Sequence, residues 1–353
     1  MKPAVRLAVA GAGLIGRAHL KAIARAASDC ELVAIVDPSP AAVEVAAQYG
    51  VPLFTGLSTM LDTMGPDGVI LATPNTLHVP GAMTCLQHGV PALIEKPVAD
   101  ELDEAVRLAR AVEASGLPFL VGHHRRHSPL LQAARAAVSS GRLGRLVTIS
   151  GSATFRKPDH YFAEGPWRCQ SGPLLINMVH EVDCLRLLAG EIVEVQALAS
   201  HAIRGHEAED TVAISLRFES GALGSFMLSD AAASPRSWEQ TSGENPSYDH
   251  HPGDDCYVLA GERGQLSVPT MRVTDYAGEA SWWAQARVRT LDLAEPGASA
   301  HARDPIARQL AHFCAVLRGE ARPLVSVADA TRTLAVTLAI RDAAASGDRI
   351  SLH

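Results

Sequence analysis

A glycine-rich hexapeptide near the start of the chain has the spacing of a phosphate-binding turn. Gly11, Gly13 and Gly16 follow a short apolar run at residues 7–10 and precede a helix-compatible segment at 17–27. In a G-x-G-x-x-G turn the first glycine permits a tight bend. The second lets the backbone approach a pyrophosphate, and the third lets helix and strand pack closely. The helix start adds unpaired N–H groups and a positive dipole end, so we expect a dinucleotide site here.

An aspartate stands where the adenosine ribose of such a cofactor is expected. A second apolar run, at residues 31–36, ends at Asp37, about 20 residues beyond the glycine turn. A carboxylate there accepts hydrogen bonds from the ribose hydroxyls and repels a 2′-phosphate. Pro38-Ser39-Pro40 offers no adjacent arginine to receive that phosphate. We therefore expect NAD to be preferred over NADP.

Strands and helices alternate through the first third of the chain. Further apolar runs at 51–54, 68–72, 90–94 and 117–121 read as strands, with helical segments between them. This pattern predicts a doubly wound parallel sheet (a Rossmann domain) over residues 1–122. Ligands of such sheets lie beyond the carboxyl ends of the strands. We expect the cofactor to contact Gly11, Gly13, Leu14, Ile15, Gly16, Asp37, Thr73, Pro74, Asn75, His78, Glu95 and Lys96.

Lys96 is the first candidate catalytic residue. Most lysines lie on solvated loops. This one directly follows an apolar strand, where nicotinamide and substrate should meet. Its ammonium could bind a substrate hydroxyl and stabilise developing alkoxide charge.

His180 is the second candidate, on a helix predicted over residues 174–190. Asn177, His180 and Asp183 recur every three residues and share one side of that helix. The same side is too apolar for a purely solvated face, so we expect a pocket wall, with a structural histidine as the alternative. We expect the substrate to contact His124, Tyr161, Trp167, Arg168, Asn177 and Asp183.

The loop at 156–168 is basic in an otherwise acidic protein. Arg156, Lys157, His160 and Arg168 gather in it. An arginine fork can bind a carboxylate at two points, so one expectation is a substrate with a carboxylate or a dense array of hydroxyls near Arg168. The alternative is a basic loop that pairs with surface acids. The histidines and acids of segment 235–255 lack metal-ligand spacing; we expect a solvated loop and no metal.

These motifs resemble the Gfo/Idh/MocA family of nicotinamide-dependent sugar and polyol oxidoreductases. The resemblance rests on GAGLIG, Asp37, the TPN motif with His78, and the EKP motif at 95–97. It extends through the segment at 122–129, Trp167-Arg168 and the helix that carries His180. Family members commonly place an aspartate four residues before the histidine, where this chain has Ile176. The resemblance therefore carries over Lys96 and His180 but not an aspartate–histidine dyad, and Asp183 is an alternative partner of His180.

The rest of the chain, 123–353, is expected to form a substrate-binding and oligomerisation domain. Apolar runs at 193–199, 211–218, 222–228, 257–260 and 265–268 read as strands. The resemblance implies a mostly antiparallel open sheet with helices on one face, and dimers or tetramers built through the other face. The final helix, 326–346, is expected to pack back toward the first domain.

Composition excludes several classes of protein. The 353 residues are 47% hydrophobic and 20% charged, with a formal net charge of −7, which argues against nucleic-acid binding. The six cysteines form no C-x-x-C pair, which favours reduced thiols. No apolar run reaches the roughly 18 residues that a membrane helix needs. We expect a cytoplasmic protein with a small-molecule substrate.

The leading hypothesis is an NAD-dependent dehydrogenase that moves a hydride between nicotinamide and a secondary alcohol of a sugar, cyclic polyol or related hydroxylated ring. Alternatives are a dihydrodiol dehydrogenase, a glycoside hydrolase that uses NAD transiently, and a non-catalytic NAD-binding regulator. The regulator ranks last, since it would lack Lys96 or His180.

Overall fold

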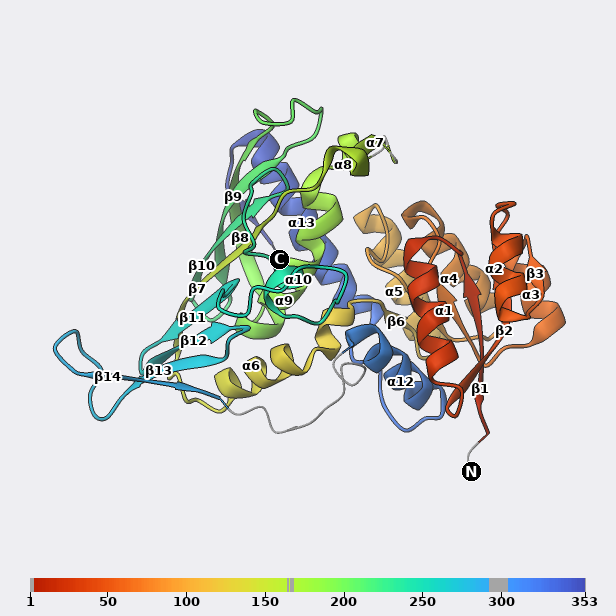
Figure 1. Cartoon of the computed structure of the whole chain (residues 1–353), viewed down its shortest axis with the longest axis horizontal. Coiled ribbons are helices and arrows are strands. Elements are labelled where there is room, and N and C mark those ends of the chain that lie inside the picture. The colour runs from red at the N-terminus through yellow and green to blue at the C-terminus, as the bar shows by residue number, and fades with distance from the viewer. Residues whose placement is uncertain (1–2, 164, 166–167, 292–303, 353) are drawn as a thin grey trace. The chain divides into compact units, whose positions relative to one another are not determined.

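A computed structural model describes residues 3–163, 165, 168–291 and 304–352 (Figure 1). The chain divides into two compact units, residues 1–127 with 304–334, and residues 128–303 with 335–353. This division differs from the expected domains, 1–122 and 123–353, because a C-terminal segment belongs to the first unit. Helix α13 (Val327–Ser346) contributes residues to both units.

The first unit is built on a six-stranded parallel sheet. Its spatial order is β3-β2-β1-β4-β5-β6, and every neighbouring pair runs parallel. The strands are β1 (Val5–Ala10), β2 (Cys30–Val36), β3 (Leu53–Phe54), β4 (Gly68–Leu71), β5 (Ala92–Ile94) and β6 (Leu120–Val121). All residues of β4 and β5 are buried, as continuous apolar runs require when helices cover both faces. The predicted parallel sheet is confirmed.

Helices connect these strands and cover the sheet. They are α1 (Leu14–Arg25), α2 (Ala42–Tyr49), α3 (Leu57–Met64), η1 (Asn75–Leu77), α4 (His78–Gln87), α5 (Leu102–Ser115) and η2 (His124–His127). Helix α12 (Pro305–Leu317) joins them from the far end of the sequence, and its Leu310 and Phe313 lie in the same core as Leu7 and Val9. The Asp304 side chain caps α12 by accepting from the Ile306 and Ala307 N–H groups. The apolar face of α12 thus explains why residues 304–334 belong to the first unit.

The second unit contains a nine-stranded mixed sheet, mostly antiparallel, of order β14-β13-β12-β11-β7-β10-β9-β8-β15. Within this sheet, as far as its residues are described, only the β7–β10 pair is parallel. The strands are β7 (Leu146–Thr154), β8 (Ile192–Ser200), β9 (Thr211–Phe218), β10 (Leu223–Ser229), β11 (Tyr257–Gly261), β12 (Gly264–Val268), β13 (Arg272–Tyr276), β14 (Ala286–Thr290) and β15 (Ile350–Ser351). The predicted antiparallel sheet is confirmed, and β13, β14 and β15 extend it beyond the expected strands.

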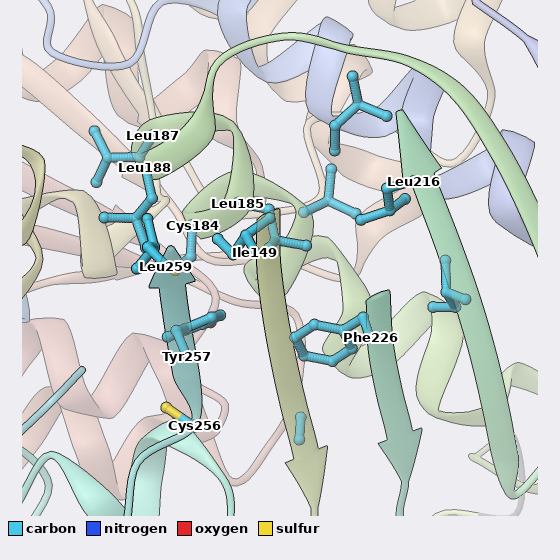
Figure 2. Packing of buried hydrophobic residues seen from close by; sticks show 14 of the residues in the cluster. Ile149, Cys184, Leu185, Leu187, Leu188, Leu216, Phe226, Cys256, Tyr257 and Leu259 are labelled. Atoms are coloured by element: carbon cyan, nitrogen blue, oxygen red, sulfur yellow. The ribbon is translucent and has the colours of Figure 1, made fainter. Parts of the chain in front are cut away.

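The inner face of this sheet packs against helices. Besides α13 these are α6 (Pro129–Ser139), η3 (Leu174–Met178), α9 (Val179–Ala189) and α10 (Trp238–Thr241), which contribute side chains to the same core. The unit also contains the short helices α7 (Asp159–Ala163) and α8 (Arg168–Pro173). Figure 2 shows Cys184, Leu185 and Leu188 of α9 among side chains of β7, β10 and β11, including Ile149 and Tyr257. The sheet's other face carries the exposed side chains of Leu198, Leu223 and Met227.

The helix predicted over 174–190 has a different start. Residues 174–178 form a π-helical turn, and regular α-helix begins at Val179. Pro173 precedes that turn, and the Leu174 N–H donates to Glu209 Oε1 at 2.9 Å instead of to the helix. The π turn changes the angular register, so a single helical wheel over the whole segment was wrong. Such turns occur often at functional sites.

No helix in the described ranges is both long and apolar enough to cross a membrane. All six cysteines are free thiols, and Cys169 alone among them is not buried.

Candidate active site

The glycine turn has the stereochemistry that a dinucleotide site requires. Gly11 adopts φ +95°, and a Cβ there would collide with the Ala72 carbonyl at the end of β4. A Cβ on Gly16 would collide with the Gly11 carbonyl. At Gly13, in contrast, no atom lies within 4 Å of the Cβ position. The turn is therefore tight where the strands and helix pack and open where a pyrophosphate would approach.

Two further features of this turn fit a nucleotide. Gly13 is the N-cap of helix α1 and supplies no side-chain cap, which leaves the first N–H groups of the helix for a phosphate. The next residue, Leu14, is 90% exposed. Thr73 lies just after the end of β4, and its hydroxyl is buried with no hydrogen-bond partner among the described residues. A bound group with a polar atom would satisfy it.

Asp37 is held against the glycine turn. Its Oδ2 accepts from the Ala12 N–H at 2.7 Å, and its Oδ1 accepts from the Ser39 N–H at 2.8 Å. The Asp37 N–H itself donates to the Phe54 carbonyl at 2.9 Å. Each carboxylate oxygen keeps a second lone pair. The carboxylate is thus fixed at the end of β2, with acceptor capacity left for ribose hydroxyls.

Glu95, the residue before Lys96, is a buried carboxylate. Its Oε1 lies 2.7 Å from Nε2 of His19 on α1, and its Oε2 accepts from the Lys96 N–H at 3.2 Å. A Cβ on Gly122 would lie within 3.0 Å of both carboxylate oxygens, so a glycine is needed there. Burial acts to raise the pKa of Glu95, but the hydrogen bond and charge of His19, with the charges of His124 and Lys96, lower it to about 2.

Two histidines of the first unit lie close to this segment. His78 is buried, and its ring nitrogens lie 2.7 Å from the Pro97 carbonyl and 3.0 Å from the Thr73 carbonyl. Both of its nitrogens are thus engaged with the backbone on either side of the site, which favours a positioning role over cofactor contact. His124, expected at the substrate, belongs to the first unit and interacts electrostatically with Glu95.

In the second unit the expected substrate residues meet a buried lysine. Lys157 Nζ donates to Asn177 Oδ1 at 2.8 Å and lies 3.3 Å from Asp230 Oδ2. Arg204 Nε donates to the other oxygen of Asp230 at 2.8 Å. Burial lowers the pKa of Lys157, as do the charges of Arg204 and Arg168, while Asp230 raises it.

Tyr161 and Arg168 lie beside this lysine. The Arg168 guanidinium carbon sits 4.0 Å from the centre of the Tyr161 ring, and Lys157 Nζ sits 5.1 Å from the same centre. Arg168 also donates to the Tyr161 carbonyl. Burial raises the pKa of Tyr161. Trp167, the other expected substrate residue of this loop, lies outside the described residues.

His180 lies in the first turn of α9 and is partly exposed, whereas Asp183 is buried. Glu181 between them is also buried and accepts a hydrogen bond from the Tyr257 hydroxyl. His180 is thus accessible on a helix whose neighbouring acids are internal. The assignment of His180 and Lys96 as catalytic residues stays a prediction.

Several residues of these two clusters escaped the sequence analysis. His19 sits in an alanine-rich helix with no local signal of its role. Asp230 and Arg204 come from connections after β10 and β8, far from Lys157 in sequence. Only the basic character of the loop at 156–168 pointed to Lys157, without naming its partner.

The segment 235–255 is more than a solvated loop. It contains α10, and Trp238 and Thr241 are buried. Glu244 accepts from Trp238 Nε1 at 3.0 Å and from the Ser128 hydroxyl at 2.6 Å. The expectation of a solvated loop was therefore wrong for its first half. Within the described ranges, no group of three or more His, Cys, Asp or Glu side chains is arranged to hold a metal ion.

Two family models match the chain. One, described as an oxidoreductase family with an NAD-binding Rossmann fold, covers residues 5–123, and the other, a GFO/IDH/MocA C-terminal domain, covers residues 131–267. Together they span well over half of the sequence, with the glycine turn, Lys96, Lys157 and His180 inside the matched ranges. The chain belongs to the Gfo/Idh/MocA oxidoreductase family.

Particular relatives are more distant. An inositol 2-dehydrogenase of Corynebacterium glutamicum is 28% identical over 63% of this chain and 66% of its own length, so that match spans slightly less than two thirds of the relative. The NAD-dependent scyllo-inositol 2-dehydrogenase of Bacillus subtilis is 25% identical over 100% of this chain and 97% of its own. The WlbA dehydrogenase of Bordetella pertussis, solved with NADH and UDP-GlcNAcA, has a TM-score of 0.79 and 26% identity over 99% of both chains.

Proposed function

We propose that the protein is an NAD-dependent dehydrogenase that oxidises a secondary alcohol of a sugar, cyclic polyol or related hydroxylated ring, or reduces the corresponding ketone. The inositol dehydrogenases among its relatives, and the similar WlbA dehydrogenase solved with NADH and UDP-GlcNAcA, support this class of reaction. The family model and the glycine turn support a nicotinamide dinucleotide. Asp37 favours NAD over NADP.

The observation that carries this proposal is the His19–Glu95 hydrogen bond. It joins α1, whose first turn forms the dinucleotide site, to the residue before Lys96. The Lys96 backbone also donates to Glu95. A fixed spacing between a phosphate-binding turn and an ammonium is what hydride transfer to a bound nicotinamide needs.

In this proposal His180 and Lys96 have different roles in the reaction. NAD, when bound, supplies the hydride acceptor. His180 takes the hydroxyl proton of the substrate as a general base while the carbon–hydrogen bond breaks and a carbonyl forms. Lys96 donates a hydrogen bond to the same oxygen and stabilises its developing negative charge. In the reverse direction His180 returns the proton to the oxygen.

Two alternatives remain within the family's chemistry. A dihydrodiol dehydrogenase would use the same residues on a different ring. A glycoside hydrolase would use NAD transiently and release no net NADH. Turnover of a panel of sugars, polyols and dihydrodiols, followed by NADH absorbance, separates these functions. A regulator that only binds NAD would turn over none of them.

The proposal includes a homodimer or homotetramer and a cytoplasmic location. Leu198, Leu223 and Met227 on the outer face of the second sheet support self-association, because such apolar side chains seldom form an uncovered sheet face. The hairpin of β13 and β14, which projects from this sheet in Figure 1, exposes Trp282 and Trp283 to 89% and 86%.

A further inference from the structure

Lys157 is the one lysine of the second unit, and it is held in place by two partners. Its side chain is 10% exposed, and its ammonium contacts Asn177 Oδ1 and Asp230. Asp230 also pairs with Arg204, so a single carboxylate serves two cations. Most lysines are solvated, and burying one costs free energy. Asp230 and Asn177 compensate part of that cost, and they hold the ammonium in one place where a ligand could meet it.

The lysine fixes the orientation of the Asn177 amide. An ammonium can only donate, so the amide pole that faces Lys157 must be the oxygen. The Nδ2 pole of Asn177 then points elsewhere, and the side chain is only partly buried. Lys157 itself has three N–H groups and, among the described residues, two oxygen partners, Asn177 and Asp230. The pair thus presents N–H donors from two adjacent side chains and no acceptor.

A second cation, Arg168, lies close to Lys157, with the Tyr161 ring beside both. Tyr161 lies 5.1 Å from Lys157 Nζ and 4.0 Å from the Arg168 guanidinium carbon, so two cations flank one ring. The positive charges of Arg204 and Arg168 repel the ammonium of Lys157 and lower its pKa. An anion bound beside Lys157 would relieve that repulsion.

The position of the pair relates this donor site to the proposed chemistry. Asn177 belongs to the π turn at 174–178, and His180 lies in the first turn of α9, which follows directly, so the two residues stand within about one helical turn along the chain. A group bound by Asn177 and Lys157 therefore lies close to the hydroxyl that His180 would deprotonate.

We propose that Lys157 and Asn177 bind a substrate carboxylate next to the reacting alcohol, so that the substrate is a hydroxy acid or sugar acid. This inference rests on the proposed function, since it takes His180 as the reaction centre. A carboxylate has two acceptor oxygens and no hydrogen, and it matches two adjacent donors. A hydroxyl oxygen also accepts hydrogen bonds, but it brings no negative charge to balance that of Lys157, so its bonds to the two donors are weaker. A phosphate would bring a second negative charge that Lys157 alone does not balance.

The test compares acids with their neutral counterparts. Suitable pairs are D-glucuronate with D-glucose, D-galacturonate with D-galactose, and D-gluconate with D-glucitol. NADH formation gives kcat/KM, and calorimetry in the presence of NADH gives the dissociation constant of each compound without turnover. We expect the acid of at least one pair to be favoured roughly 100-fold in both measurements, as two charge-assisted hydrogen bonds allow. Equal dissociation constants within every pair, or tighter binding of glucose 6-phosphate than of any acid, would overturn the inference.

Two variants locate the effect. Lys157→Met should reduce the ratio of kcat/KM for the acid to that for its neutral counterpart at least tenfold. Asn177→Asp should make the neutral compound the better substrate, because the new carboxylate would pair with Lys157 and repel the substrate acid. Lys21→Met, at an exposed lysine of α1, is the matched control and should keep the wild-type ratio. Asp230 keeps its 2.8 Å partner Arg204 when Lys157 is removed, so no buried acid is left unpaired. If Lys157→Met does not fold, Asn177→Asp decides.

The outcomes separate this inference from the proposed function. Tight binding of acids without any NADH formation would keep the carboxylate site and contradict the dehydrogenase. NADH formation from neutral polyols with no preference for acids would keep the dehydrogenase and contradict the carboxylate site.

Discussion

His19 Nε2 lies 2.7 Å from Glu95 Oε1, and the two side chains are buried, with exposures of 1% and 5%. One residue sits in the helix that follows the dinucleotide turn, and the other directly precedes Lys96. A buried carboxylate is stable only with such a partner. The pair therefore joins helix α1 to the segment of Lys96, and we expect it to contribute to the acid stability of the first unit.

Acid unfolding tests this pair. The pKa of Glu95 in the folded chain, about 2, is below its ordinary value of 4.5. The stabilisation is therefore present above pH 4.5 and is lost as the pH falls toward 2. His19→Ala should lower the free energy of unfolding at neutral pH by about 3 kcal/mol, because it leaves a buried charge unpaired. It should also move acid unfolding to higher pH.

Urea unfolding at a series of pH values, followed by circular dichroism, measures both effects. His88→Ala is the control, because His88 pairs at 3.3 Å with Asp62, which is 69% exposed. An exposed pair of this kind contributes less than about 1 kcal/mol. If the free energy of unfolding depends on pH in the same way for His19→Ala and His88→Ala, the buried pair does not stabilise the fold more than the exposed pair does.

The cofactor prediction concerns Asp37. The wild-type protein should show a higher kcat/KM with NAD than with NADP, because the carboxylate fixed at the glycine turn repels a 2′-phosphate. Asp37→Ser should narrow that ratio at least tenfold, mainly through the KM for NAD. Initial rates with both cofactors measure the ratio. A wild-type preference for NADP would refute the assignment.

The fold of the first unit was largely predictable, because fully apolar strands and glycine turns are local signals. The continuous apolar runs at residues 68–72 and 90–94 predict buried parallel strands from the sequence alone. The position of α12 was not predictable, since nothing local shows that Phe313 packs in the same core as Leu7. The boundary between the units was missed for the same reason.

The motifs of the candidate site could be predicted from the sequence, whereas the contacts between its side chains from distant segments could not. Glycine spacing and strand ends are properties of the sequence, so the turn, Asp37 and Lys96 could be found. The contacts around Asn177 could not, because Lys157 reaches it from a separate loop, and Lys157 in turn pairs with Asp230 from a separate strand end. The π turn at 174–178 also depends on a distant residue, Glu209, which takes the Leu174 N–H.

Self-association is predicted from the outer face of the second sheet. Light scattering at micromolar concentration should give a mass of at least twice the 37.3 kDa of the chain. Leu223→Lys with Met227→Lys, which places charges on that face, should shift the mass toward the monomer. Trp282→Ser is a separate variant that tests the hairpin. A wild-type monomer would rule out the oligomer.

The roles of Lys96 and His180 are separable by kinetics. If His180 is the base, His180→Ala should lower kcat roughly 10²–10⁴-fold and abolish the acidic limb of the pH profile, with little change in NAD affinity. Lys96→Ala should depress kcat and also weaken substrate binding, because one ammonium serves ground and transition states. Lys96→Arg should not restore activity, since a planar fork does not replace a compact charge.

A double variant completes that test. If both residues act on the same hydroxyl, the effects of Lys96→Ala and His180→Ala should fall well short of additivity. If Lys96 is itself the base, Lys96→Ala will abolish the titration while His180→Ala keeps its shape. Measurements of kcat against pH for the three variants distinguish these assignments.

The most direct test of the central claim is the stoichiometry of NADH and oxidised product. Purified protein is incubated with NAD and the sugars, polyols and sugar acids named above, and NADH absorbance is compared with carbonyl product measured by mass spectrometry. The dehydrogenase assignment predicts equimolar NADH and ketone from at least one compound, with neither formed by the Lys96→Ala, His180→Ala double variant. Cleavage of a glycoside without accumulation of NADH, or NAD binding with no turnover of any compound, would contradict it.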